Sequence, residues 1–342
     1  MSLITVKKNV PLQTYTTLGV GGFAEYFVEV STNAELAEAV SYAQTHSLSI
    51  HVIGGGSNVL VADEVLHGLV IHISSKGMLA NNNGDAITLT VQAGEELDDV
   101  VSYCVQQGWW GMENLSHIPG TVGASPIQNV GAYGVEVKDV INSVQVFNIE
   151  TEKFETITNS DCAFSYRNSF LKSREGKKYI VTAVTFLLST IPRPLLSYRD
   201  LENYFKDSPT PPSLLEIREA VISIRGEKFP NWHEVGTAGS FFKNPIVSKQ
   251  KFDELLLKYP DIPGFYISDT EVKIALGWIL DKVLHLKGYT EGQVATYTQQ
   301  ALVIVVQKNA TALEVEDFAK KIMQKVQVAT GIDIEFEVTL MK

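Results

Sequence analysis

The sequence predicts an α+β protein with a larger N-terminal part and a smaller C-terminal part. Strand-like and helix-like segments are mixed throughout residues 26–190. Five prolines between Pro192 and Pro212 then indicate a connector between domains. Beyond them the pattern becomes mainly helical, with two further strand-like runs, which is typical of a second, smaller α+β unit.

The elements of the larger part follow from their periodicity. Thr32 is a plausible N-cap for a helix over residues 33–45. A second helix is predicted over residues 95–107, because its apolar side chains, Leu97 and Cys104 among them, recur at helical spacing. Strands are expected at residues 26–30, 51–53, 58–62, 69–73, 87–92, 144–149, 154–157 and 180–188.

The smaller part contains a strand-like run with an alternating charge pattern. Within residues 332–340, Asp333, Glu335 and Glu337 share one face of the predicted strand. This face is either a solvated polar surface or one that directs a carboxyl group into a cleft. The other expected elements are helices at residues 213–225, 248–258, 271–285 and 311–329 and a strand at 301–306.

Composition narrows the class of function. The chain has 342 residues and a net charge of −11, which argues against a nucleic-acid backbone as the main partner. It contains neither a run of about 20 apolar residues nor an apolar signal-peptide core near its N-terminus. Cys104 and Cys162 are isolated, and no CxxC, HExxH or Cys/His cluster is present, so we expect buried thiols in a reducing cytoplasm and no metal.

Two glycine-rich segments are the strongest local signals. Residues 118–134, IPGTVGASPIQNVGAYG, contain four glycines and no charge, which suits a backbone that approaches a ligand closely. Residues 53–58, IGGGSN, lie between two predicted strands, where successive N–H groups either form a nest for a diphosphate or simply close a tight hairpin. By contrast, residues 19–24 fit GxGxxA but precede a predicted strand, so we reject a Rossmann fingerprint there.

Two polar groups are candidates for chemistry. Ser240 lies in a glycine-containing turn, GTAGSFFKNP, where its hydroxyl either contacts a ligand and donates a proton or only completes a turn. This turn is not a GxSxG nucleophile elbow. Arg167, in SYRNS, is either a rigid cation for a carboxylate or an ordinary surface residue.

Taken in order, seven motifs resemble those of the UDP-N-acetylenolpyruvoylglucosamine reductases. The likeness as a whole runs from about Thr16, where the chain reads TTLGVGG, to Val338 at the end of IEFEV, and so covers nearly the full chain. LSYRDL at residues 196–201 is similar to the type I form, in which a tyrosine loop covers the substrate. The motifs are IGGGSN, IPGTVGASPIQNVGAYG, SYRNS, GTAGSFFKNP, GWILD, QQALV and IEFEV.

The resemblance implies noncovalent FAD in a two-lobed domain of the vanillyl-alcohol-oxidase (PCMH) type. This domain is expected at residues 1–200, with lobes at about 1–65 and 66–200. Residues 201–342 are expected to carry the UDP-sugar and to return Glu337 to the site. The residues implied in FAD binding are Ile53, Gly54, Gly55, Gly56, Ser57, Asn58, Leu60, Ile118, Pro119, Gly120, Gly123, Ser125 and Gln128.

The implied reaction has two halves. NADPH reduces FAD, and UDP-N-acetylglucosamine enolpyruvate then takes a hydride from flavin N5 and a proton from Ser240. By resemblance, Arg167 and Glu337 flank the substrate carboxylate and stabilise the enolate. A guanidinium suits that charge, whereas the Glu337 carboxyl would need a raised pKa to help. Residues implied near the UDP-sugar are Tyr166, Tyr198, Arg225, Lys228, Lys243, Asn244 and Gln300.

Two alternative functions remain. An oxygen-reacting flavin oxidase on the same cofactor fold would keep both glycine segments but would not need GTAGSFFKNP or IEFEV. A non-catalytic flavin or nucleotide binder would not be reduced by NADPH. For the reductase we expect a cytoplasmic monomer whose partner is the small UDP-sugar, with no nucleic acid or membrane, acting in peptidoglycan synthesis and hence in cell shape and division.

Overall fold

The computed structural model describes residues 2–342, so Met1, at the start of the expected first lobe, lies outside the described residues. The chain forms two compact units. Unit 1 contains the residues up to Val10, Ala24–Gly56 and His67–Arg225, and unit 2 contains Pro11–Phe23, Ser57–Leu66 and Gly226–Lys342. These units divide the chain differently from the expected domains at 1–200 and 201–342, which remain a prediction.

Unit 1 is built mainly on two sheets. One has the strand order β1-β2-β5-β3, with β3 parallel to β5, and the other is an antiparallel sheet with the order β11-β10-β12-β7-β6. A short hairpin joins β8 to β9. The strands are β1 Lys7–Pro11, β2 Phe23–Val30, β3 Ile50–Ile53, β5 Leu66–Ile73, β6 Met78–Asn83, β7 Ala86–Gln92, β8 Gly131–Ala132, β9 Val135–Glu136, β10 Ile141–Asn148, β11 Lys153–Thr158 and β12 Tyr179–Ser189.

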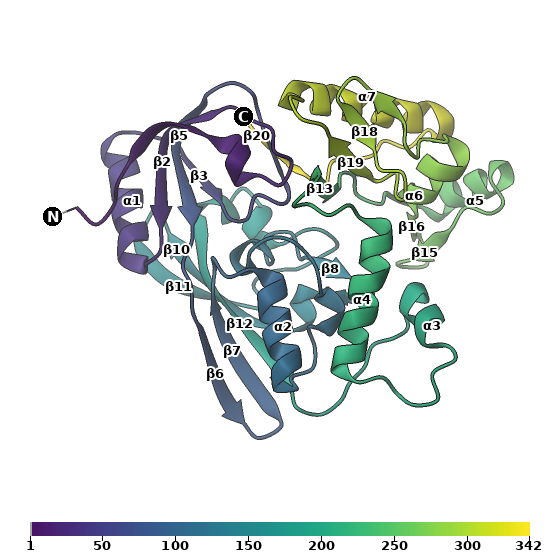
Figure 1. Cartoon of the computed structure of the whole chain (residues 1–342), viewed down its shortest axis with the longest axis horizontal. Helices are drawn as coiled ribbons and strands as arrows, with labels where there is room; N and C mark the ends of the chain where they lie inside the picture. The colour runs from purple at the N-terminus through teal and green to yellow at the C-terminus, as the bar shows by residue number, and fades with distance from the viewer. Residues whose placement is uncertain (1) are drawn as a thin grey trace. The chain divides into compact units, whose positions relative to one another are not determined.

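The helices of unit 1 begin and end where the local chemistry favours it. α1, Asn33–Thr45, starts at a capping box in which Thr32 Oγ1 accepts from Glu35 N (3.2 Å) and Glu35 Oε2 accepts from Thr32 N (3.1 Å). α2, Leu97–Gln107, ends at Gly108 in the left-handed conformation. α2 runs beside α4, Leu214–Lys228 (Figure 1). Side chains of both helices share a buried apolar cluster with α3, Arg199–Phe205.

Unit 2 combines two small antiparallel sheets with a long helix. Their strand orders are β13-β19-β18-β17 and β14-β16-β15. α7, Ala312–Thr330, packs against β18 (Figure 1), and β20 pairs with β4 in parallel. The remaining elements are β4 Val59–Val61, β13 Gly236–Ser240, β14 Ile246–Ser248, α5 Lys249–Lys258, β15 Gly264–Tyr266, β16 Glu271–Ile274, α6 Leu276–Trp278, β17 Thr290–Glu291, β18 Val294–Thr296, β19 Val303–Val306 and β20 Thr339–Met341.

The helix expected over residues 271–285 is wrong in its first half. Glu271–Ile274 forms β16, which pairs with a strand on each side, and only then follow α6 and a π-helical turn at Ile279–Val283. Val272, Ile274 and Leu276 are all fully buried. Their spacing of two is a strand period, and the helical pattern begins only after it.

The strand expected over residues 332–340 forms only at its end. Ile332, Ile334 and Val338 are buried, as the alternation predicts, but only Thr339–Met341 is a strand. The preceding part makes a single bridge, between Phe336 and Phe242. Its partner segment then reaches Pro245, which has no N–H with which to extend the pairing.

Candidate active site

The two glycine-rich segments meet inside unit 1. A Cβ on Gly54 would lie 2.3 Å from Thr121 Oγ1, and one on Gly55 would lie 3.1 Å from Gly120 Cα. Gly56 and Gly120 have φ values of +61° and +110°, which glycine adopts readily. The structure therefore needs glycine on both sides of this contact and leaves bare backbone there. Such backbone suits the diphosphate of a bound dinucleotide, so the residues present fit FAD.

A buried amide holds the second glycine segment in its irregular path. Asn129 has no exposed surface and a φ of +49°. Its Nδ2 donates to Glu136 Oε2 (3.0 Å) and to Ser165 O (3.1 Å), while its Oδ1 accepts from Lys138 N (3.2 Å). No role for Asn129 was predicted from the sequence. A buried Asn must be satisfied by hydrogen bonds, and this need is the signal that could have identified it.

Arg167 lies on a tight turn that Asn129 ties to the glycine segment. Ser165 and Asn168 exchange two backbone hydrogen bonds (3.0 and 3.1 Å), and Arg167 between them has a φ of +53°. Its Nη2 donates to Gly131 O (3.2 Å), and its guanidinium lies 5.5 Å from the centre of the Tyr166 ring. A non-glycine residue at positive φ is costly and is retained mainly where a site requires it.

His117, at the entrance to the glycine segment, is held from both sides. Its N–H donates to Asp98 Oδ1 (2.6 Å), and its carbonyl accepts from Arg225 Nε (2.9 Å). Arg218 binds both oxygens of Asp98 (2.6 and 3.0 Å). Burial alone would raise the pKa of Asp98, but these hydrogen bonds outweigh burial and hold its pKa below the usual value. The sequence analysis missed this brace because its members lie far apart in the chain.

Two residues expected near the UDP-sugar flank the same tyrosine. The Tyr198 and Tyr133 rings meet edge to face with their centres 5.3 Å apart. Burial raises the pKa of Tyr133 to about 12, while the neighbouring Arg225 partly opposes the rise. Arg225 is itself buried and donates to His117, so in unit 1 it braces the glycine segment.

Ser240 ends a strand of unit 2 just after a bulge. The register between β13 and β19 shifts between Thr237 and Ser240, and Gly239 in between has a φ of +70°. The Gly239 N–H donates to Thr237 Oγ1 (3.2 Å). Bulges of this kind redirect a side chain at the edge of a sheet, and Ser240 is left half-buried.

Glu337 lies on the chain segment next to Ser240. The Glu337 N–H donates to Phe241 O (2.9 Å), one residue beyond the serine. On the other side, Asn58 Nδ2 donates to Glu337 O (3.1 Å). The structure thus brings three predicted site residues, Ser240, Glu337 and Asn58, onto adjoining backbone of unit 2.

The remaining predicted residues of the GTAGSFFKNP and QQALV motifs contact their neighbours in unit 2. Lys243 Nζ pairs with Glu335 Oε2 (2.7 Å), and Asn244 Oδ1 accepts from Leu276 N (3.0 Å) at the start of α6. Gln300 Oε1 accepts from Leu302 N (3.3 Å). Lys228, at the end of α4, is half-buried. The fold thus positions the side chains of Lys243, Asn244 and Gln300.

The other predicted cofactor residues divide between the units. Ser125 is buried, and its Oγ donates to Val122 O (2.8 Å). Leu60 is buried in the apolar core of unit 2. Gly123 packs against Ala93, because a Cβ there would lie 2.5 Å from the Ala93 Cβ. Unit 1 also contains Ile53, Ile118, Pro119 and Gln128, and unit 2 contains Ser57.

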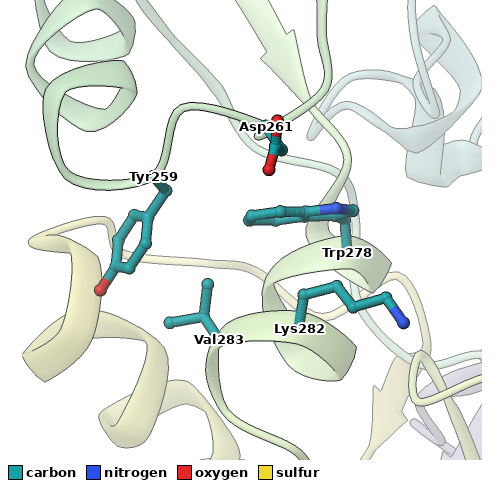
Figure 2. A pocket seen from close by; sticks show the side chains of 5 residues that line it. All are labelled: Tyr259, Asp261, Trp278, Lys282 and Val283. Atoms are coloured by element: carbon teal, nitrogen blue, oxygen red, sulfur yellow. The ribbon is translucent and has the colours of Figure 1, made fainter.

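A separate cavity of about 600 Å³ lies in unit 2. It is lined by Tyr259, Asp261, Trp278, Lys282 and Val283 (Figure 2). Trp278 belongs to the GWILD motif, but no predicted site residue lines the cavity. Within residues 2–342, no cluster of acidic, histidine or cysteine side chains is arranged to hold a metal ion, and no helix is long and apolar enough to cross a membrane. Both cysteines are buried free thiols.

Comparison with known proteins assigns each half of the chain. A family described as an FAD binding domain matches residues 24–157, and the C-terminal domain of UDP-N-acetylenolpyruvoylglucosamine reductase matches residues 231–341. The expected α+β fold and FAD-binding domain are therefore confirmed.

Full-length relatives agree with these matches. The chain is 39% identical over 336 residues to the UDP-N-acetylenolpyruvoylglucosamine reductase of Neisseria meningitidis, covering 97% of this chain and 96% of that protein. It is also 39% identical to the Bdellovibrio bacteriovorus reductase, over 95% and 96% of the two chains. The crystal structure of the Thermus caldophilus reductase superposes with a TM-score of 0.70 at 25% identity, over 99% of this chain and 100% of that one. The chain therefore belongs to the UDP-N-acetylenolpyruvoylglucosamine reductase family of flavin-dependent oxidoreductases.

Proposed function

We propose that this protein uses NADPH and noncovalently bound FAD to reduce UDP-N-acetylglucosamine enolpyruvate to UDP-N-acetylmuramate. The observation that carries the proposal is the pairing of the Ser240 and Glu337 segments, in which Glu337 N donates to Phe241 O. This pairing joins the two motifs that distinguish a reductase from an oxidase on the same cofactor fold. It supports a site that couples proton delivery to stabilisation of negative charge.

The proposed reaction adds a hydride and a proton across the enolpyruvyl double bond. FAD, when bound, supplies the hydride that it has received from NADPH. The hydride joins the methylene carbon, and negative charge then develops on the adjacent carbon and its carboxylate. Ser240 Oγ delivers its proton to that adjacent carbon, which completes the lactyl ether and leaves a serine alkoxide that is reprotonated from water.

Arg167 and Glu337 are the proposed stabilisers of the enolate. Arg167 is pre-ordered, because its turn is closed by two backbone hydrogen bonds and its Nη2 is engaged with Gly131 O. A guanidinium fixed in this way stabilises developing charge without reorganising. Glu337 is held at both its N–H and its carbonyl, so its side chain starts from a defined position. We propose that its carboxyl group is protonated when the enolate forms.

The glycine-rich segments and the nearby polar residues are the proposed binding groups. Gly54–Asn58 would bind the diphosphate of FAD, and residues 118–134 would line the cofactor. Tyr166, Tyr198, Arg225, Lys228, Lys243, Asn244 and Gln300 remain the proposed contacts or near neighbours of the UDP-sugar. For Arg225, the bond to His117 supports an indirect role through the glycine segment.

The product would be a precursor of peptidoglycan. We therefore propose a role in cell-wall biogenesis, cell shape and cell division, and a cytoplasmic location where UDP-sugars are made. We also propose that the protein acts as a monomer with the UDP-sugar as its partner, without nucleic acid or membrane. A single elution volume at the monomer mass, independent of concentration, would support that part of the proposal.

Ser240→Ala tests the proposed chemistry by separating the two half-reactions. We expect NADPH to bleach the bound flavin of the variant at the wild-type rate. Reoxidation by UDP-N-acetylglucosamine enolpyruvate should slow by about 10²- to 10⁴-fold, because one placed proton donor is lost. Ser268→Ala, at an exposed serine of the same unit, is the matched control. Wild-type reoxidation by the Ser240 variant would end the assignment of Ser240.

A further inference from the structure

The chain beyond Glu337 forms a short strand, β20, which within residues 2–342 belongs to a two-stranded sheet with β4. β20 aligns in parallel with β4, with Thr339 opposite Val59 and Met341 opposite Val61. The Ala62 N–H then donates to Met341 O (2.9 Å). A two-stranded pairing of this length is marginal by itself, so groups at its ends decide how firmly it is held.

Asn58 anchors the end of this pairing that is nearer to Glu337. Its side-chain Nδ2 donates to Glu337 O (3.1 Å), and its carbonyl accepts from Thr339 N (3.0 Å). One residue thus bonds the chain on both sides of Val338. Because Asn58 also belongs to the first glycine-rich segment, its substitution would disturb two features at once and would not isolate the role of the strand.

An ion pair anchors the opposite end of β20. Lys342 Nζ donates to Glu316 Oε1 (2.8 Å) on α7. Lys320 Nζ, also on α7, contacts the same carboxylate oxygen (2.9 Å). The side chain of Glu316 is only 11% exposed, whereas those of the two lysines are more than half exposed. Glu316 is therefore shared between one lysine of its own helix and one of the C-terminal strand.

Polar contacts also fasten this region to α7. A cavity of about 340 Å³ lies beside the strands, and Leu60, Leu340 and Lys342 are among the residues that line it together with the start of α7. At the edge of this cavity, Asp63 just beyond β4 accepts from Ala312 N and Leu313 N of α7 (2.8 and 2.9 Å). Lys342 and Asp63 thus fasten β20 and β4 to the same helix.

We propose that Lys342 is a positioning residue for Glu337, which it holds in place through β20 by its ion pair with Glu316. The role of Glu337 in this inference rests on the proposed function, whereas the fastening of the strand does not. Release of Lys342 would let the last residues detach from β4. The Glu337 carboxyl would then be correctly placed for a smaller fraction of the time, although no group that contacts the substrate has changed.

Charge reversal at Lys342 tests this role. In Lys342→Glu, Glu316 repels the new carboxylate instead of attracting an ammonium group, which weakens the attachment of β20. We therefore expect amide hydrogen exchange in residues 335–341 of the FAD-bound enzyme to become about 3- to 10-fold faster. Lys320→Glu places the same charge beside the same carboxylate but on α7 itself. This control should leave exchange in residues 335–341 unchanged, and Lys342→Arg should retain the wild-type rate.

Rapid kinetics on the same proteins tests the link to Glu337. We expect reoxidation of the reduced flavin by UDP-N-acetylglucosamine enolpyruvate to slow in Lys342→Glu, because Glu337 is then in place in a smaller fraction of the molecules. Flavin content and the rate of reduction by NADPH should stay at wild-type values. This split distinguishes positioning of Glu337 from a general loosening of the protein, which would slow both half-reactions.

Three results would overturn the inference. The first is unchanged exchange in Lys342→Glu, the second is equal acceleration in Lys320→Glu, and the third is faster exchange with wild-type reoxidation. Failure of the proposed function gives a different pattern, because the wild-type enzyme itself would then not be reoxidised by the substrate. Exchange would still decide in that case whether Lys342 fastens the strand.

Discussion

At the scale of single residues, the site depends on glycines, whose lack of a side chain lets two backbone segments approach each other closely. A Cβ on Gly54 or Gly55 would require a neighbour to shift, because Thr121 and Gly120 lie against them. The sequence predicted both glycine segments as ligand-approaching backbone, since glycine is the residue type that such a backbone requires. That the segments touch could not be predicted, because 60 or more residues separate them and nothing local encodes the contact.

The roles of several buried polar residues of unit 1 could not be predicted from the sequence either. Asp98, Asn129 and Glu113 each hold backbone of the glycine region or of its approach. Asp, Asn and Glu are residue types that usually lie on the protein surface, and only the folded structure shows that these three are partly or fully buried. By contrast, Arg167 and Ser240 could be singled out early, because their local sequences already indicated turns.

Glu113 gives a prediction about pH. It is 3% exposed, and its Oε2 accepts from Gly111 N (2.7 Å). Burial raises the pKa of Glu113, and the Gly111 bond offsets only part of the rise. A folded pKa above the unfolded one means that stability is fully present below the unfolded pKa and is lost as pH rises through the folded pKa.

Glu113→Gln should therefore stabilise the protein in a pH-dependent way, since the amide oxygen can keep the Gly111 bond without a buried charge. We expect similar melting temperatures for the variant and the wild type near pH 4. At pH 8 the variant should melt higher by about 2–4 °C for each kcal/mol gained. Glu175→Gln, at an exposed site of the same unit, is the control. A difference that is the same at both pH values would contradict this account of Glu113.

At the scale of elements, sequence periodicity predicted the helices well where a cap marked their ends. α1 and α7 both begin at capping boxes, built on Thr32 and Thr311, and both fall within one residue of the predicted ranges. Prediction failed at residues 271–285 and 332–340, where pairing partners from distant segments decide the outcome. The short strands of unit 2 were mostly missed for the same reason.

The start of α7 gives a prediction at this scale. Asp63 accepts hydrogen bonds from Ala312 N and Leu313 N, in addition to the Thr311 capping box. A carboxylate also interacts favourably with the positive end of the helix dipole. Asp63→Ala should therefore lower the free energy of unfolding by about 1 kcal/mol. Thermal or urea unfolding of the FAD-free protein would measure this loss.

Glu64→Ala is the matched control for the α7 prediction, because it removes the neighbouring exposed carboxylate. Asp63→Asn should fall between the wild type and Asp63→Ala, since one acceptor oxygen remains while the charge is lost. Equal stability of Asp63→Ala and Glu64→Ala would show that the bonds to α7 contribute nothing.

At the scale of the whole molecule, composition and element order predicted the α+β class correctly. They could not predict that Pro11–Phe23 and Ser57–Leu66 leave the N-terminal part and join the C-terminal unit. This exchange gives Glu337 its partner Asn58 and gives β20 its partner β4. The order of elements along the chain suggested a single domain boundary near residue 200. Local sequence patterns do not show which N-terminal segments pack into the core of the C-terminal unit.

The central claim is that one bound flavin links NADPH to a UDP-sugar enolpyruvate. An anaerobic absorbance titration of the purified protein with NADPH, followed by UDP-N-acetylglucosamine enolpyruvate, tests it most directly. The account predicts that NADPH bleaches the flavin spectrum and that the UDP-sugar restores it. Bleaching without recovery would contradict the proposed substrate assignment. A protein that cannot be reconstituted with FAD would contradict the proposed role of both glycine segments.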